Sequence, residues 1–243
     1  MKTIRTSIIA SVLLAVIALS ACKKNGSSNA PVVASGTSKL SFQLSADATD
    51  STGTVPDSSK SSITGLTWAA GTANIGRFSF EAKRNGVSIN IDSHNLTNVD
   101  LFALTPLVTY VTLDTGVYKE IRIKAYLQSS NNDSIPPLKL TGTFTNDSTK
   151  VTPIEFDLTE NSIVQVSAKN IDINGTTDYT ALLDMQLGKV TKGITAADLN
   201  KATLTDGKII ISKKSNVFLY YKIRANISGC GRSFFREHHK DRG

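Results

Sequence analysis

The sequence predicts an all-β protein, specifically an antiparallel β-sandwich, on three observations. Apolar and polar residues alternate in many short segments, clusters of turn-forming residues separate those segments, and only one short segment has a helical pattern. Alternation places apolar side chains on one face of a strand, so each segment predicts a half-buried strand. Many short strands without intervening amphipathic helices favour two packed antiparallel sheets with Greek-key connections over a parallel sheet.

The clearest element is a β-hairpin in the first third of the chain. Phe78, Phe80 and Ala82 alternate with polar residues, and the same pattern returns over residues 87–91. Asn85-Gly86 lies between the two segments, and this pair readily adopts the positive φ angles of a type I′ turn. An earlier strand is predicted over residues 40–44 by the same alternation.

Later segments repeat the pattern between clusters of Gly, Asn, Asp, Ser and Thr. Strands are predicted over residues 121–127, 138–144, 154–158, 163–168, 180–187, 209–212 and 218–223, and the last of these is expected to close the fold. The one helical pattern lies over residues 195–201. There Thr195 is the expected N-cap and Asp198 holds the capping-box position.

The N-terminus has the pattern of a bacterial lipoprotein signal. Lys2 and Arg5 precede a 12-residue apolar segment over residues 8–19, which is too short to span a bilayer. The tetrapeptide at residues 19–22 resembles the lipobox of bacterial lipoproteins, whose cysteine is acylated before cleavage. We therefore expect residues 1–21 to be removed and Cys22 to be lipidated, which anchors the chain to the outer membrane without spanning it.

The composition after the signal excludes several classes of protein. The formal net charge of +7 falls to +5 without Lys2 and Arg5, and no stripe of basic residues with interleaved aromatics points to nucleic acid. Cys230 is the only cysteine besides Cys22, so neither a disulfide framework nor a cysteine metal cluster is predicted. No cofactor is expected.

The chain divides into four regions by composition. A flexible tether over residues 22–38 follows the signal, because its small and polar residues cannot bury enough apolar surface to offset their ordering entropy. Residues 39–228 form the β-sandwich domain, as one unit or as two packed subdomains. Residues 229–243 break every earlier pattern and predict a basic disordered tail.

Three stretches together resemble a known kind of domain. They are residues 99–104, residues 115–123 and the pair of segments 155–158 and 163–166, which contain a Gly-x-Tyr turn before a strand and a Phe-Asp pair. Over about residues 63–190 the chain resembles uncharacterised lipoprotein domains of Bacteroidota. The resemblance implies a prealbumin-like or fimbrillin-like β-sandwich and no assigned catalysis.

No catalytic or metal-binding constellation emerges from the motifs. His94 lies in a polar segment with Asp92 and Ser93, but neighbours on an extended backbone point to opposite faces and cannot form a triad. Three acidic groups offer oxygens for calcium, although none has EF-hand spacing. They are Asp147 with Asn146, Glu155 with Asp157 and Glu160, and Asp172 with Asp178. We predict no catalytic residue and no metal site.

Binding and modification are better supported than catalysis at the surface. Arg122, Lys124 and Tyr126 share the polar face of one predicted strand and form a candidate ligand face. Trp68, the only tryptophan, is expected in the core. Three Asp-Ser pairs look like the O-glycosylation motif of exported Bacteroidota proteins, with candidate acceptors at Ser51, Ser134 and Ser148.

These observations predict a non-enzymatic, lipid-anchored protein of the cell envelope. Its expected role is binding, adhesion or assembly, with a glycan or another envelope protein as partner and no nucleic acid. Two alternatives stay open. One is a carbohydrate-binding lipoprotein of a glycan-uptake system, and the other is a hydrolase whose site one sequence does not reveal. The sequence does not decide whether the domain faces the periplasm or the cell surface.

Overall fold

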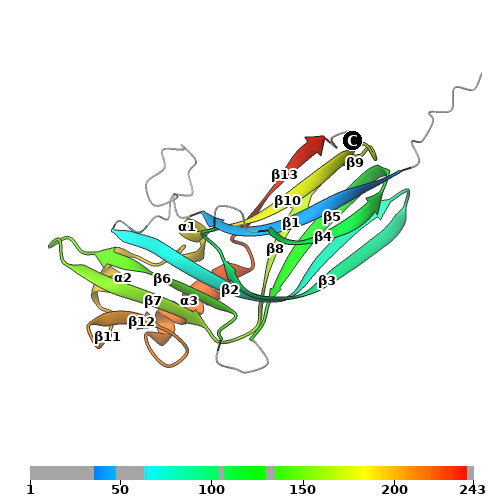
Figure 1. Ribbon diagram of the computed structural model, residues 1–243. Coiled ribbons are helices and arrows are strands. Elements are labelled where there is room, and N and C mark those ends of the chain that lie inside the picture. Colours follow the sequence, from blue (N-terminus) through cyan, green and yellow to red (C-terminus); the bar gives the residue numbers. More distant parts are fainter. Residues whose placement is uncertain (1–35, 48–62, 64, 104–106, 130–134, 240–243) are drawn as a thin grey trace, which may run out of the picture. The chain divides into compact units, whose positions relative to one another are not determined.

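The computed structural model describes residues 36–47, 63, 65–103, 107–129 and 135–239, all within one unit, Val33–Gly243. Strands dominate these residues, which confirms the all-β prediction in its general form (Figure 1). The signal segment, Cys22, Ser51 and Ser134 lie outside the described residues. The first strand begins at Thr37, so the predicted tether includes two residues that belong to the domain.

The first sheet has four strands in the order β13-β10-β1-β4. Their bounds are β13 (Gly231–His239), β10 (Thr177–Gln186), β1 (Thr37–Asp47) and β4 (Leu107–Asp114). β1 and β10 run parallel, from the pair Leu40 and Tyr179 to the pair Asp47 and Gln186. Eight strands lie between them in sequence, so no tight hairpin imposes an antiparallel orientation.

The second sheet has nine strands, with β11-β12-β7-β6-β2-β5-β8 as its main path. β3 pairs with β2, and β9 pairs with β5. The bounds are β2 (Leu66–Arg84), β3 (Val87–Asp100), β5 (Gly116–Leu127), β6 (Leu138–Thr145), β7 (Val151–Leu158), β8 (Ser162–Ala168), β9 (Ile171–Ile173), β11 (Leu204–Thr205) and β12 (Lys208–Ile211). β12 and β7 are also parallel, so the prediction of a wholly antiparallel fold was wrong for two strand pairs.

The 19-residue strand β2 organises the second sheet. Its first half pairs with β6 and its second half with β5, while β3 covers the other edge. Asn74 lies where β6 gives way to β5, and its Nδ2 donates to the Gln128 carbonyl at 2.5 Å. Its backbone N–H donates to the Pro137 carbonyl, so one buried residue fixes the ends of both neighbouring strands.

The predicted β2–β3 hairpin is confirmed. Asn85 and Gly86 have φ angles of 51° and 79°, as a type I′ turn requires. β3 continues through His94 to Asp100, well beyond the alternating segment that predicts a strand at residues 87–91. Pairing with β2 supplies the backbone partners that the polar sequence does not predict.

One hydrophobic core contains side chains from both sheets. Phe42 of β1 stacks on Phe78 of β2 with ring centroids 5.9 Å apart, and it also contacts Phe80. Trp68 is buried, as predicted. Aromatic pairs of this kind contribute about 0.5–1.5 kcal/mol beyond the area they bury.

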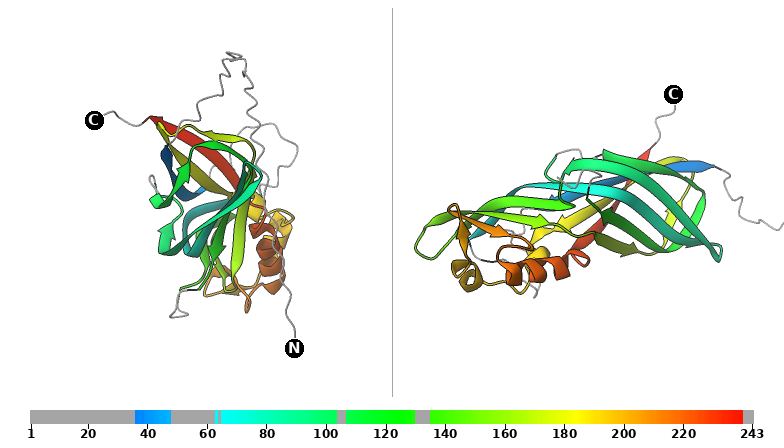
Figure 2. Two further views of the ribbon diagram at one scale, coloured as in Figure 1. Left: turned by 90° about the vertical axis from the view of Figure 1, so that its right-hand side faces the viewer. Right: turned by 90° about the horizontal axis from the view of Figure 1, so that it is seen from below.

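Three helices gather at one end of the domain, beside β7 and β12 (Figures 1 and 2). They are α1 (Leu187–Val190), α2 (Ala196–Asn200) and α3 (Val217–Ile227). The helix predicted over residues 195–201 is confirmed as α2. Its capping box has Asp198 N donating to Thr195 Oγ1 at 3.1 Å and Thr195 N donating to Asp198 Oδ2 at 2.9 Å.

The strand predicted over residues 218–223 was wrong, because this segment belongs to helix α3. Its β-branched and aromatic residues favour a strand locally. The buried residues Leu219, Tyr220, Ile223 and Ile227 instead follow the helical spacing, and packing of that face selects the helix.

The disordered tail predicted for residues 229–243 was wrong over Gly231–His239, which form β13. The strand pairs antiparallel with β10 from Thr177 and His239 to Met185 and Gly231. Phe235 is the partly buried apolar residue of this strand that packs against the core. The strand therefore has little of the alternation of apolar and polar residues that predicts strands from sequence. Backbone hydrogen bonds to β10 hold this segment as a strand, although its sequence pattern does not predict one.

Candidate functional site

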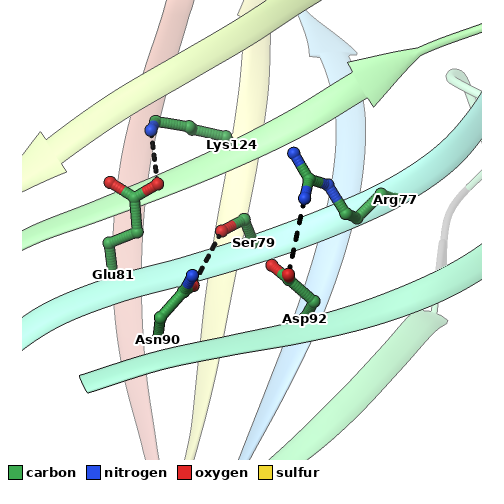
Figure 3. Close-up of polar contacts among 6 residues, drawn as sticks. All are labelled: Arg77, Ser79, Glu81, Asn90, Asp92 and Lys124. Atoms are coloured by element: carbon green, nitrogen blue, oxygen red, sulfur yellow. Dashed lines mark hydrogen bonds and ion pairs between the residues drawn. The ribbon is translucent and has the colours of Figure 1, made fainter.

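The predicted ligand face lies on the outer side of β5, next to the polar sides of β2 and β3. Strand pairing places Tyr126 opposite Arg77 and Lys124 opposite Ser79. On the other edge of β2, Ser79 pairs with Asp92 of β3. The structure therefore brings residues of three strands into one polar surface, which Figure 3 shows.

Most charges on this surface are paired within the protein. Lys124 donates to the Glu81 carboxylate, and Arg77 Nη1 lies 3.4 Å from Asp92 Oδ2 (Figure 3). The Arg77 guanidinium also lies over the Tyr126 ring, 3.9 Å from its centroid. Tyr126 is half-buried beneath it. A ligand must compete with these contacts.

Arg122 is the exposed member of the predicted set and lies opposite Glu81. The three predicted residues thus share one face, as expected from their alternation. A binding role for Arg122, Lys124 and Tyr126 stays a prediction.

Two of the candidate calcium-binding acids are paired with a lysine. Lys139 Nζ lies 2.5 Å from Glu155 Oε1 and 3.5 Å from Asp157 Oδ1. The hydrogen bond from Lys139 lowers the pKa of Glu155, whereas burial raises the pKa of Asp157. The arrangement is a cross-strand ion-pair cluster between β6 and β7.

Glu160, in the turn after β7, is held by two cations. Lys213 Nζ lies 2.7 Å from Glu160 Oε1, and Arg224 Nε contacts the other oxygen. The Lys213 hydrogen bond lowers the pKa of Glu160 and raises that of Lys213. Among the described residues, no three His, Cys, Asp or Glu side chains are grouped to hold a metal ion.

Ser148 is the one candidate glycosylation site within the described residues. It is exposed in the loop between β6 and β7. Asn146 Oδ1 accepts from the backbone N–H groups of Ser148 and Lys150, each at 3.0 Å, and so fixes the loop. Glycosylation of Ser148 stays a prediction.

A different surface gathers exposed apolar side chains around helix α3. Its members, which we call the α3 surface, are Leu204 (46% exposed), Val217 (42%), Phe218 (64%) and Tyr221 (48%). Phe218 and Tyr221 are three positions apart and lie on one side of the helix. Asn216 Nδ2 donates to the Thr203 carbonyl at 2.9 Å, which brings the chain before Leu204 to the start of α3.

Charged groups border the α3 surface. The Lys222 ammonium lies 4.4 Å from the Phe218 ring centroid and donates to the Gly193 carbonyl at 2.7 Å. Its Nζ is also 3.6 Å from Asp198 Oδ2. The α3 surface therefore combines exposed rings with cations and with the carboxylates of Asp198 and Glu160.

The surrounding segment is strongly basic. Residues 187–230 contain eight lysines and arginines but only two aspartates, a net charge of +6. Those basic residues are mostly not consecutive in the sequence. The fold gathers them at the helical end of the domain.

Sequence reasoning missed the α3 surface because it assigned the segment to a strand. Two signals pointed to the helix. Leu219, Ile223 and Ile227 repeat every four residues, and Gly229 follows them as a typical residue beyond a helix C-terminus.

No helix among the described residues has the length and hydropathy needed to cross a bilayer. Comparison of the chain with models of protein families, with curated proteins and with solved structures finds no match.

Proposed function

We propose that this chain is a non-catalytic binding protein of the cell envelope, anchored to the outer membrane by lipid on Cys22. The N-terminal signal pattern supports the anchor. The single observation that supports binding is the α3 surface, where Leu204, Val217, Phe218 and Tyr221 are exposed together. Adjacent exposed apolar side chains in a folded domain mark interaction sites.

The proposed scaffold is a β-sandwich of the prealbumin-like or fimbrillin-like kind found in Bacteroidota lipoproteins. The Phe42–Phe78 stack joins the two sheets, in support of face-to-face packing. The sheet edges also adjoin, because β13 contacts β8 and β4 contacts β3. Two sheets packed in this way form a rigid scaffold that can carry a binding surface at one end.

The α3 surface lies at the end of the domain away from the chain's entry. β1 begins at Thr37 and runs parallel to β10, which leads directly into α1 beside α3 (Figure 1). The 11 residues of β1 span about 35 Å at 3.2–3.4 Å per residue. The start of β1 and the α3 surface therefore lie at opposite ends of the domain.

The anchor is tested by membrane fractionation of cells that produce the wild type or Cys22→Ala. We expect the wild type in the membrane fraction and the variant in the soluble fraction. Membrane retention of Cys22→Ala would refute the lipid anchor. Protease treatment of intact cells then assigns the surface or periplasmic side, and digestion in intact cells is compatible with adhesion.

The binding role is tested with the chain carrying Cys22→Ala, which has no lipid of its own, and with envelope fragments stripped of protein. We expect this chain to sediment with the fragments, and the same chain with Phe218→Ser/Tyr221→Ser to stay in solution. Tyr110→Ser is the matched control, because Tyr110 is also exposed and has the Lys39 ammonium 4.1 Å from its ring centroid. Equal sedimentation of all three proteins would refute the α3 surface as the binding site.

A further inference from the structure

We infer that the α3 surface binds an acidic glycan, a chain of sugar rings that carry carboxylates. This inference rests on the proposed binding function and names its ligand class. It depends on three properties of the described residues: exposed rings, local net charge and the carboxylates beside the rings.

The rings provide a platform of the right kind for sugars. Phe218 and Tyr221 are both exposed and lie one helical turn apart on α3. The negative face of an aromatic ring attracts the C–H groups on the apolar face of a pyranose. Tyr221 also packs edge-on against the buried Tyr220, with centroids 5.4 Å apart, so the packing of the core limits its movement.

The charge distribution selects an anionic ligand. The mature chain carries a net charge of +5, and residues 187–230 alone carry +6, so the remainder has a net charge of −1. Even with Glu160, which contacts Lys213 and Arg224, the segment that contains the rings holds a net charge of +5. Such a local potential attracts polyanions and raises their association rate.

The carboxylates favour a glycan over a membrane surface. Glu160 contacts Lys213 and Arg224, and Asp198 lies beside Lys222, so acids are interspersed among the cations. The hydroxyl groups of an acidic glycan can donate hydrogen bonds to these acids while its carboxylates lie at the neighbouring cations.

The test measures affinity of the full chain, in detergent, for polygalacturonate, alginate and hyaluronate. Polygalacturonate is compared with its methyl ester, which keeps the sugar backbone and removes the charge. We expect the ester to bind at least about tenfold more weakly, and affinity for the acid forms to fall as salt rises from about 50 to about 200 mM. Equal affinity for both forms, or no binding to any of the three glycans, would overturn the inference.

Two variants locate the contact. Phe218→Ser/Tyr221→Ser removes both rings and Lys213→Gln/Lys214→Gln removes two exposed charges, and each is expected to reduce affinity about tenfold. Tyr110→Ser and Lys39→Gln are the matched controls on the other sheet and should bind as the wild type does.

Vesicles of anionic phospholipid, mixed without detergent with the Cys22→Ala chain, distinguish a membrane ligand, because that chain has no lipid of its own to insert. If the vesicles bind with the same dependence on Phe218 and Tyr221 while the glycans do not bind, the acidic-glycan inference is wrong. The proposed binding function survives that result, because it requires only that the α3 surface is the contact. Loss of envelope binding in the sedimentation assay remains the separate test of the function itself.

Discussion

Arg232 of β13 donates from Nη2 to Oδ2 of Asp184 on β10, at 2.9 Å. The two residues are direct cross-strand neighbours, and the Asp184 side chain is only 6% exposed. Ser45 Oγ donates to the other carboxylate oxygen at 3.1 Å, so Asp184 links β13, β10 and β1. A buried carboxylate of this kind requires its partners to offset the cost of leaving water.

Replacement of Arg232 with alanine should therefore destabilise the domain. Removal of one partner leaves a buried charge incompletely compensated, at a cost of 3–5 kcal/mol in fully buried pairs. The Arg232 side chain is 43% exposed, so we expect a loss of about 2 kcal/mol in the free energy of unfolding. Urea unfolding followed by circular dichroism measures it.

Arg236→Ala is the control, since Arg236 is exposed on the same strand. It removes the same type of side chain and should change the free energy of unfolding by less than about 0.5 kcal/mol. Equal effects of the two substitutions would show that the Arg232–Asp184 pair does not hold β13 in place.

The same strand shows where prediction from sequence fails. Alternation locates strands that bury one face, and it correctly places the buried residues of β1, β2 and β5. β13 has little such signal, because its neighbours Arg232 and Arg236 are exposed and Phe235 is only partly buried. Its order depends on pairing with β10, which is a property of the fold and not of the local sequence.

At the candidate ligand face, too, the sequence predicts the pattern within one strand but not the contacts between strands. Arg122, Lys124 and Tyr126 share a face, as a period of two predicts. Sequence cannot show that Arg77, from a strand more than forty residues earlier, covers the Tyr126 ring. The exposure of Phe218 was missed because its segment has high β-propensity, and tertiary packing overrides that preference.

Gly142 marks a close approach of β6 to β2. A Cβ atom at this position would lie 2.0 Å from the Thr67 carbonyl oxygen and 2.9 Å from the Trp68 Cα. Gly142→Ala must therefore separate two backbones, and we expect a loss of about 3 kcal/mol or more in the free energy of unfolding. Thermal and urea unfolding measure the change.

Gly229→Ala provides the comparison for this prediction. A Cβ atom at Gly229 has no neighbouring heavy atom within 4 Å, and this glycine is not among those with positive φ. Its free energy of unfolding should stay within about 0.5 kcal/mol of the wild type. If Gly142→Ala is as stable as Gly229→Ala, the described approach of β6 to β2 is incorrect.

The α2 capping box predicts a pH-dependent effect. Thr195→Ala removes the N-cap and should cost about 1 kcal/mol at neutral pH. The hydrogen bond from the Thr195 backbone N–H lowers the pKa of Asp198 below its ordinary value of 3.8. Stabilisation by the charged Asp198 is therefore complete above that value and is lost as pH falls through the lowered pKa.

Urea unfolding of the wild type, Thr195→Ala and Asp198→Asn at several pH values tests the capping box. The wild type and Asp198→Asn should converge as the pH drops below about 4, because protonation removes the charge that the substitution removes. Thr205→Ala, at an exposed position in β11, is the control. A pH-independent difference between the wild type and Asp198→Asn would refute the role of the Asp198 charge.

Cys230, which follows α3, is buried. Burial raises the pKa of its thiol from 9.0 to about 12, so almost no thiolate exists at neutral pH. A pKa raised on folding contributes stability below pH 9.0 that is lost as pH rises toward about 12. The native protein should therefore resist alkylation at pH 8 and become less stable in alkaline solution.

Thiol titration of the membrane-extracted chain measures both cysteines at once. We expect no reactive thiol in the native protein and one after denaturation, because lipidation occupies Cys22 and unfolding exposes Cys230. Cys230→Ser, which removes the second thiol, should show none in either state. A reactive thiol in native Cys230→Ser would show that Cys22 is free. A reactive thiol in the native wild type, with none in native Cys230→Ser, would show that Cys230 is accessible.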